Sequence, residues 1–175
     1  MVNVRDVISS IIFYGLIIVI LTVIVRVGRT YGWAKVDEEF KEMEPGIGRG
    51  EYMWINKRAC KVEDIRHNDM IVYRRPPWKR VNWTTEVARV IGLPGDLVRL
   101  RFTQIFRAER QKDGQLAEEA PVTEYYVAPY QRPQDFGQFM VPRNTVFVMF
   151  DQRRGRQELR NLIVPERSIL GKVIH

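Results

Sequence analysis

The sequence predicts one membrane-spanning helix at the N-terminus, followed by a mainly β domain of antiparallel strands. Two observations carry this prediction: an uncharged apolar run near the start, and a later series of short apolar runs separated by turn residues. The chain has 175 residues, enough for one membrane segment and one compact domain with a modest core. Its hydrophobic content of 45% and aromatic content of 11% indicate a folded protein rather than a disordered one.

The apolar run covers residues 7–25, "VISSIIFYGLIIVILTVIV", and contains no charged residue. At about 1.5 Å per residue it spans roughly 28 Å, close to the hydrocarbon thickness of a bilayer. The basic and aromatic stretch that follows suits a membrane interface, whereas a cleavable signal has a shorter apolar core and a small-residue cleavage site. The alternative is a buried helix of a soluble domain. One arginine precedes the run and three basic residues follow it closely, so flanking charge does not set the orientation.

We therefore divide the chain into an anchor at 1–26, a polar connector at 27–41 and a β domain at 42–175. The apolar runs of the β domain are rich in Val, Ile, Tyr and Phe, several alternate with polar residues, and Gly, Pro, Asn or Asp separates most of them. They lie at 51–57, 69–74, 86–93, 96–102, 123–130, 144–150 and 168–175. A polar insert near 107–121 interrupts the pattern and is expected to form a hairpin tip or a loop.

The net charge of +7 comes from 28 Lys and Arg against 21 Asp and Glu, and it favours anionic partners such as lipid headgroups or an acidic protein surface. The chain has one cysteine, Cys60, and only two histidines. This composition excludes an internal disulfide framework, and we expect neither a metal site nor a cofactor. For Cys60 we expect a small buried position in a strand.

Three motifs follow the apolar run in order: "EMEPGIGRGEYMWINK" at 42–57, "ARVIGLPGDLV" at 88–98, and a segment from 141 to 173 that contains "VFVMFDQRR" and "GKV". Together they resemble the three sequence boxes of type I signal peptidases, which are serine–lysine membrane peptidases. Each motif alone is weak, but their order behind a membrane anchor is specific. The matching residues are Met43, Pro45, Arg89, Gly92, Pro94, Gly95, Asp96, Asp151, Arg153, Arg160, Gly171 and Lys172. The resemblance implies twisted antiparallel sheets held close to the membrane.

The residues that perform chemistry in this family are replaced here. A serine–lysine peptidase needs a hydroxyl nucleophile and an amine whose pKa is lowered by burial. The resemblance places the nucleophile at Glu42 and the base at Ala88. It places the oxyanion-hole hydroxyl at Phe40 and the serine that orients the lysine at Arg156. Since alanine has no proton acceptor, the resemblance implies a pseudopeptidase without catalytic residues.

The alternative is an active membrane-bound signal-peptidase-type serine endopeptidase with a non-standard site. Ser168 is the one serine beyond the apolar run, Thr84 and Thr85 are further hydroxyls, and Lys41 and Lys79 are loose candidates for a base. A relocated pair needs its two groups within about 3 Å of each other. Nothing in the sequence spacing suggests such a pair.

Two replacements lead to structural expectations. Glu42 and Arg156 replace two uncharged catalytic-site residues with opposite charges, so they could form an ion pair there, or each could point into water. Phe150 stands where the family has glycine, and its ring either plugs the cleft or packs into the core. The segment 36–45, "VDEEFKEMEP", is charged where the family binds an apolar peptide, which opposes burial of such a substrate.

We therefore expect an accessory or structural subunit of a larger membrane protein complex, whose partners are other membrane-protein subunits. The stretches 73–80 and 125–136 mix aromatics with Arg and Pro, a composition enriched at interfaces, although they could equally be ordinary solvated loops. By resemblance, the membrane is a cytoplasmic or mitochondrial inner membrane, and the β domain lies on the periplasmic or intermembrane-space side. No nucleic-acid partner is expected on that side.

Overall fold

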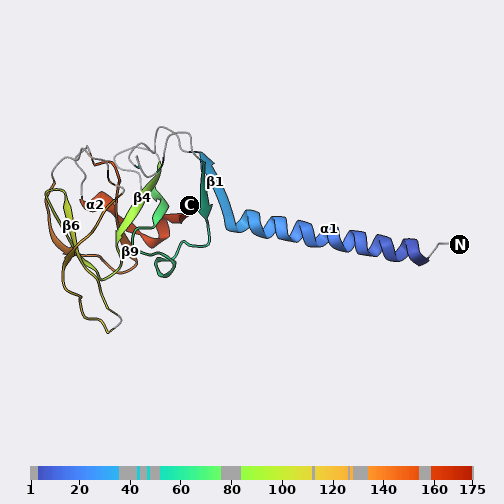
Figure 1. The fold of residues 1–175 in the computed structure, drawn as a ribbon, viewed down its shortest axis with the longest axis horizontal. Helices are drawn as coiled ribbons and strands as arrows, with labels where there is room; N and C mark the ends of the chain where they lie inside the picture. The colour runs from blue at the N-terminus through green and yellow to red at the C-terminus, as the bar shows by residue number, and fades with distance from the viewer. Residues whose placement is uncertain are drawn as a thin grey trace.

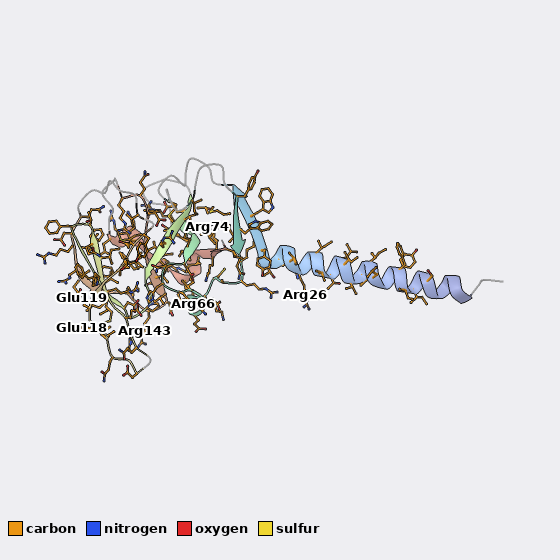
Figure 2. The ribbon with its side chains drawn as sticks, in the orientation of Figure 1. Arg26, Arg66, Arg74, Glu118, Glu119 and Arg143 are labelled. Atoms are coloured by element: carbon orange, nitrogen blue, oxygen red, sulfur yellow. The ribbon has the colours of Figure 1, made fainter. Side chains whose placement is uncertain are left out.

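In the computed structural model, a long helix projects from a domain of strands (Figure 1). The structure describes residues 4–35, 43, 47, 52–75, 84–111, 113–125, 127, 134–153 and 159–174. The helix α1 covers Val4–Thr30, and its segment Ile11–Thr30 has a mean hydropathy of 2.6 with none of it buried in the protein. α1 is therefore long and apolar enough to cross a membrane, and it is not a core helix. Arg26 lies at the end of α1 that joins the strands (Figure 2).

Seven of the described strands form one sheet in the order β1-β2-β11-β3-β4-β9-β10, and every neighbouring pair is antiparallel. In chain order these strands are β1 (Tyr31–Lys35), β2 (Tyr52–Asn56), β3 (Met70–Arg75), β4 (Thr84–Gly92), β9 (Thr145–Met149), β10 (Ile163–Pro165) and β11 (Ile169–Ile174). The 3-10 helices η2 (Val62–Asp64) and η3 (Glu166–Ser168) precede β3 and β11, and the short helix α2 (Leu159–Leu162) precedes β10.

A second sheet has the order β7-β6-β5-β8 and is also antiparallel. It consists of β5 (Leu97–Arg101), β6 (Gln104–Ala108), β7 (Ala120–Pro121) and β8 (Phe136–Met140). The chain enters this sheet after β4 and leaves it before β9. The predicted fold class, one apolar N-terminal helix plus a mainly antiparallel β domain, is confirmed.

One hydrophobic core joins the two sheets. The centre of the first sheet is buried on both faces, because β3 begins with four buried residues and β9 ends with four. From β9, Phe147 packs edge-on against Phe139 of β8, with 5.0 Å between the ring centroids. The β-branched and aromatic residues that marked the apolar runs are thus the residues that fill the space between the sheets.

The structure differs from the sequence prediction at several segments. Residues 27–35, expected as connector, are the end of α1 and the strand β1. No strand includes the described residues 123–125 and 127 of the predicted run at 123–130. The backbone N–H of Val122 still donates to Ile105 O at 2.8 Å. Two residues further on, the chain is no longer part of a strand, and the side chain of Glu124 binds Arg153. The region 107–121 holds the end of β6, a bridge from Arg110 to Leu116, and β7.

Gly171 allows β2 and β11 to approach each other closely. A Cβ atom at this position would lie 2.6 Å from the carbonyl oxygen of Asn56 and 2.7 Å from Cγ2 of Ile55. These distances are shorter than real Cβ contacts, and the oxygen belongs to the backbone, so the two strands would have to separate. The glycine of the last motif therefore holds the β1–β2 hairpin against the rest of the sheet.

We predict that Gly171→Ala lowers the free energy of unfolding by about 1–3 kcal/mol, because an added methyl group overpacks the contact between β2 and β11. The measurement is thermal or denaturant unfolding of the full chain in detergent, followed by the β signal in circular dichroism. Gly137→Ala in β8 is the matched control, since nothing lies within 4 Å of a Cβ there. Equal stability of the two variants would contradict the role of Gly171.

Candidate active-site region

Ala88 lies in the middle of β4 and is fully buried, with 0% of its surface exposed. It stands directly opposite Ile71 of β3, and Ile71 stands opposite Lys172 of β11. Residues directly opposite each other in adjacent strands share a sheet face, so the methyl group of Ala88 lies on the face that carries Lys172. Two residues further along β11, Ile174 stands opposite Trp54 on the same face. The position that the resemblance assigns to the base is therefore a sealed apolar position.

Part of the first motif is packed into the same core. Met43 is 0% exposed and Ile47 2%, and both belong to the hydrophobic cluster that contains Ala88. The backbone N–H of Ile47 donates to Met43 O at 3.0 Å. Phe40, Glu42, Pro45 and Arg156 lie outside the described residues, so the Glu42–Arg156 ion pair stays a prediction.

The turn after β4 is organised around the carboxylate of Asp96, which is 3% exposed. Its Oδ2 accepts the backbone N–H of Leu93 at 2.8 Å, and its Oδ1 accepts that of Arg110 at 3.0 Å. Gly95 has a φ of +89°, a conformation that glycine adopts without strain. Backbone hydrogen bonds of 2.9 Å join Gly95 N to Val141 O and Val141 N to Asp96 O. The segment that leaves the first sheet after β4 and the segment that returns to it before β9 are thus hydrogen-bonded to each other at this turn.

His67 completes the environment of Asp96, and sequence reasoning gave it no role. Its Nε2 donates to Asp96 Oδ2 at 2.7 Å, and its Nδ1 lies 3.5 Å from Glu109 Oε1. Burial alone would raise the pKa of Asp96, but the hydrogen bonds from His67, Leu93 and Arg110 outweigh it and hold this pKa below its usual value. His67 lies 29 residues from Asp96, so no local pattern announces the contact.

A buried ion pair lies immediately beside Ala88. The guanidinium of Arg89 donates to both carboxylate oxygens of Asp151, at 3.0 and 2.7 Å, and also to Asn68 O at 3.1 Å. Asp151 is 0% exposed, and this burial raises its pKa although Arg89 acts in the opposite direction. Breaking such a pair would leave a buried charge uncompensated, so the pair fixes β4 to the end of β9.

A second buried pair joins the last motif to the chain beyond β7. Arg153, 2% exposed, donates from Nε to Phe150 O at 3.0 Å and from Nη1 to Glu124 Oε2 at 2.9 Å. Sequence reasoning did not find Glu124. Phe150 is 9% exposed and belongs to the hydrophobic cluster, so its ring packs into the core. Arg160 has an exposed side chain on α2.

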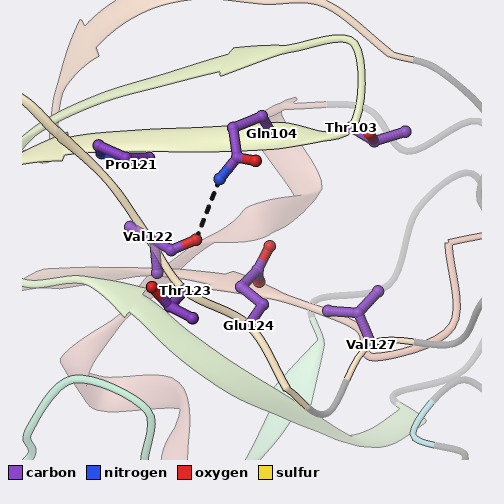
Figure 3. Close-up of a pocket in the computed structure, with 7 residues that line it drawn as sticks. All are labelled: Thr103, Gln104, Pro121, Val122, Thr123, Glu124 and Val127. Carbon is purple, nitrogen blue, oxygen red and sulfur yellow. Dashed lines mark hydrogen bonds between the residues drawn. The ribbon is translucent and has the colours of Figure 1, made fainter.

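Glu124 also lines a surface pocket of about 420 Å³ (Figure 3). The other lining residues are Thr103, Gln104, Pro121, Val122, Thr123 and Val127. Inside the pocket Gln104 Nε2 donates to Val122 O at 3.1 Å. The carboxylate of Glu124 is engaged by Arg153, and these seven residues include two hydroxyls but no lysine or histidine. Among these described lining residues, neither hydroxyl has a lysine or histidine beside it that could act as a base.

Ser168 and Thr85 are the hydroxyl candidates for a relocated site whose surroundings the structure describes. Ser168 ends η3 and is half-buried, while Lys172 Nζ lies 2.8 Å from Asp69 Oδ2 in an ion pair. Thr85 is exposed on β4. Both base candidates, Lys41 and Lys79, lie outside the described residues.

Cys60 is not a buried strand residue, as the sequence led us to expect. It is half-buried in the loop after β2, where its Sγ donates to Lys57 O at 2.8 Å. Burial, and then the negative charge of Asp64, raise the pKa of the thiol. A raised pKa keeps the sulfur in the thiol form, which is a poor nucleophile.

We predict that Ala88→Lys destabilises the folded chain by at least about 3 kcal/mol at pH 7, because burial lowers a lysine pKa by up to about 3–5 units from about 10.4. The unfolded state then binds the proton more tightly, so the loss relative to the wild type shrinks as the pH rises toward about 10. Denaturant midpoints between pH 6 and pH 9.5 measure this. Thr85→Lys, at an exposed position near the start of β4, should show neither the loss nor its pH dependence.

Asp96→Asn should lower the free energy of unfolding by about 2 kcal/mol at pH 7, because a charged acceptor of three hydrogen bonds becomes a neutral amide. The folded pKa of Asp96 lies below its ordinary value of 3.8, so the carboxylate stabilises the fold above that pH. This stabilisation is lost as the pH falls through the folded pKa, and the two proteins should converge there. Asp113→Asn, at an exposed loop aspartate, is the control. An unchanged difference between pH 7 and pH 3 would contradict the role of the charge.

Comparison with known proteins places these features in a family. The family model described as "signal peptidase, peptidase S26" matches residues 11–175. A signal peptidase I P of Bacillus subtilis subsp. natto is 27% identical over 154 residues, which cover 87% of this chain and 80% of the relative. An inactive signal peptidase IA of Staphylococcus aureus strain COL is 22% identical over 133 residues, covering 75% of this chain and 71% of the relative.

A crystal structure of a signal peptidase I from Enterococcus faecalis V583 aligns with a TM-score of 0.46 at 22% identity, and the alignment covers 63% of this chain and 97% of that one. The relatives thus include proteins named as signal peptidases and proteins named as inactive ones. Because the family model spans nearly the whole chain, the protein belongs to the signal peptidase family, peptidase S26.

Proposed function

We propose that this chain is a catalytically inactive member of the signal peptidase family, and that it works as an accessory or structural subunit of a larger membrane protein complex. The observation that carries the proposal is the burial of Ala88 beside an intact structural motif. Arg89 and Asp96, which match the family, hold β4 and its turn in place. The residue directly before Arg89, where the family's lysine belongs, contributes only a methyl group with 0% of its surface exposed.

The chemistry of the family requires more than the fold. A hydroxyl must lose its proton to an uncharged amine, and that amine must be buried so that it is uncharged near neutral pH. A methyl group cannot accept a proton, and the carboxylate of Glu42 cannot replace a hydroxyl that forms an acyl-enzyme. We infer that the scaffold has been retained while the reactive pair has been lost. The existence of relatives named as inactive signal peptidases supports this reading of the family.

The location follows from the same proposal. α1 fits a single-pass anchor, and we propose an inner membrane with the β domain on the periplasmic or intermembrane-space side, by analogy with the family. The proposed partners are other membrane-protein subunits that contact the β domain. The stretches 73–80 and 125–136, predicted as contact regions, lie largely outside the described residues, although Tyr125 is 93% exposed.

We predict that the purified full chain, reconstituted in vesicles, leaves a signal-peptide-bearing precursor uncut over hours. A Bacillus signal peptidase I under the same conditions provides the positive control. Gel analysis and mass spectrometry of the precursor measure cleavage at the signal-peptide junction. Wild-type cleavage that disappears in Ser168→Ala, while the matched hydroxyl variant Thr85→Ala stays active, would overturn the proposal and establish a relocated site.

The subunit role needs its own measurement. Gentle solubilisation of native membranes, followed by size-exclusion chromatography, should place the chain in a fraction larger than its 20.7 kDa mass and its detergent belt explain. Cross-linking before solubilisation should give the same partners. A chain that elutes alone after both treatments would refute the subunit role and leave the loss of catalysis untouched.

A further inference from the structure

The turn between β5 and β6 holds a large aromatic residue in a backbone conformation that such residues rarely adopt. Phe102 has a φ of +58°, in the left-handed region where a Cβ atom crowds the backbone. The other non-glycine residues of the described chain with a positive φ are Asn68 and Asn144, and asparagine is enriched in this region. Phenylalanine therefore makes this turn less stable than asparagine or glycine would.

The ring of Phe102 gains little from contacts within the chain. Phe102 is 64% exposed, and the guanidinium of Arg101 lies 6.0 Å from its ring centroid, the outer limit of a cation–π contact. The backbone is nevertheless fixed, since Phe102 O accepts the N–H of Gln134 at 2.7 Å. A conformation that lowers stability and leaves its side chain in solvent points to a function outside the fold.

A hollow begins at the residue after Phe102. Thr103 and Gln104 line the surface pocket of about 420 Å³ (Figure 3). The hydroxyls of Thr103 and Thr123 and the side-chain amide of Gln104 give part of its wall a polar character, and this amide also donates to Val122 O at 3.1 Å. An exposed apolar ring and a partly polar hollow are thus adjacent on one surface, and a partner of complementary shape can cover both.

The turn is placed away from the membrane anchor. β6 begins directly after it, and β6 lies at the end of the β domain opposite α1 (Figure 1). A partner that contacts the turn therefore meets this chain in water rather than in lipid. Two described residues of the stretch 125–136, whose composition predicts a contact region, border the same place, because Val127 lines the pocket and Gln134 binds Phe102 O.

The charge beside the ring determines which partner surface fits. Arg101 is exposed, and the ion pairs among the described residues do not include it. Aromatic residues and arginine are the residue types that most often dominate the binding energy of protein interfaces. A partner that buries both side chains needs an apolar pocket for the ring and a carboxylate at its rim for the guanidinium.

We propose that the β5–β6 turn is the contact through which this chain binds a partner subunit on the aqueous side of the membrane. The ring of Phe102 enters an apolar pocket of the partner, an acidic residue of the partner pairs with Arg101, and a polar side chain of the partner occupies the hollow beside Thr103. Burial of the ring in the complex offsets the unfavourable φ of Phe102. This inference rests on the proposed subunit role and identifies the surface that performs it.

The first measurement is the thermal stability of Phe102→Asn in the full chain in detergent. Asparagine adopts the left-handed conformation more readily, so the variant should raise the thermal midpoint by at least about 2 °C. Leu116→Asn is the control, because Leu116 is 40% exposed near another turn and has no positive φ, and it should not raise the midpoint. An unchanged or lower midpoint for Phe102→Asn would show that the ring supports the fold itself and would overturn the proposal.

The second measurement is a competition for the partner in native membranes. Wild-type and Phe102→Asn chains with different tags are expressed together in excess of the partner, solubilised gently and separated by size-exclusion chromatography. The ratio of variant to wild type in the assembled fraction, divided by the same ratio in the free fraction, gives the relative affinity. This value should fall at least about tenfold for Phe102→Asn, because loss of an aromatic anchor weakens an interface strongly, and should stay near one for Leu116→Asn.

The outcomes separate this proposal from the subunit role. Equal competition by Phe102→Asn, with wild type in the assembled fraction, would overturn the proposal and leave the subunit role intact. Wild type that elutes alone would refute both. Arg101→Glu is the second variant if Phe102→Asn does not fold, and it too should lose at least about tenfold in relative affinity; equal competition would overturn the proposal. A disulfide between two Phe102→Cys chains that carry Cys60→Ser would show that a second copy covers the turn, which would also overturn it.

Discussion

The carboxylate of Asp96 is the point on which the rest of the β domain depends. The chain passes from the first sheet to the second after β4 and returns before β9, and both passages meet at this residue. Two backbone N–H groups and the ring of His67 satisfy its oxygens, while its own carbonyl accepts the N–H of Val141. A buried carboxylate is tolerated because these donors replace the water that it has lost. Together with the hydrophobic core that the two sheets share, these hydrogen bonds fix the position of one sheet relative to the other.

Arg89 and Ala88 are neighbours in β4, but they contribute to the fold in different ways. Arg89 engages Asp151 across the sheet, whereas the preceding residue, Ala88, only fills space in the core. A lysine at position 88 would lower the stability of the folded state, because burial disfavours its charged form. Only a catalytic role would compensate for this loss of stability. At this buried position alanine is therefore the more stable residue. The neighbouring arginine persists, because its loss would leave Asp151 buried without a partner.

The sequence allowed the strands with strong apolar runs to be predicted, and it failed where a strand is short or polar. β2, β5, β9 and β11 lie within predicted runs, and so does most of β3 and β4. β6 and β8 were missed, because "QIFRA" and "FGQFM" give too short a pattern to stand out from loops. β1 was missed because its aromatics resembled a membrane flank. The turn at Asp96 can be predicted because its residues are adjacent in the sequence. His67 and Glu124 are each 29 residues from their partners, and no sequence pattern predicts contacts over that separation.

The absence of a linker between Thr30 and Tyr31 has a mechanical consequence. A domain on a flexible linker can adopt many orientations relative to its membrane helix. Here a rotation of α1 about its own axis also rotates the β domain. The rotation of α1 about its axis therefore sets the direction in which the β domain points. Small changes in helix tilt are likewise transmitted to the strands, since no intervening hinge can absorb them.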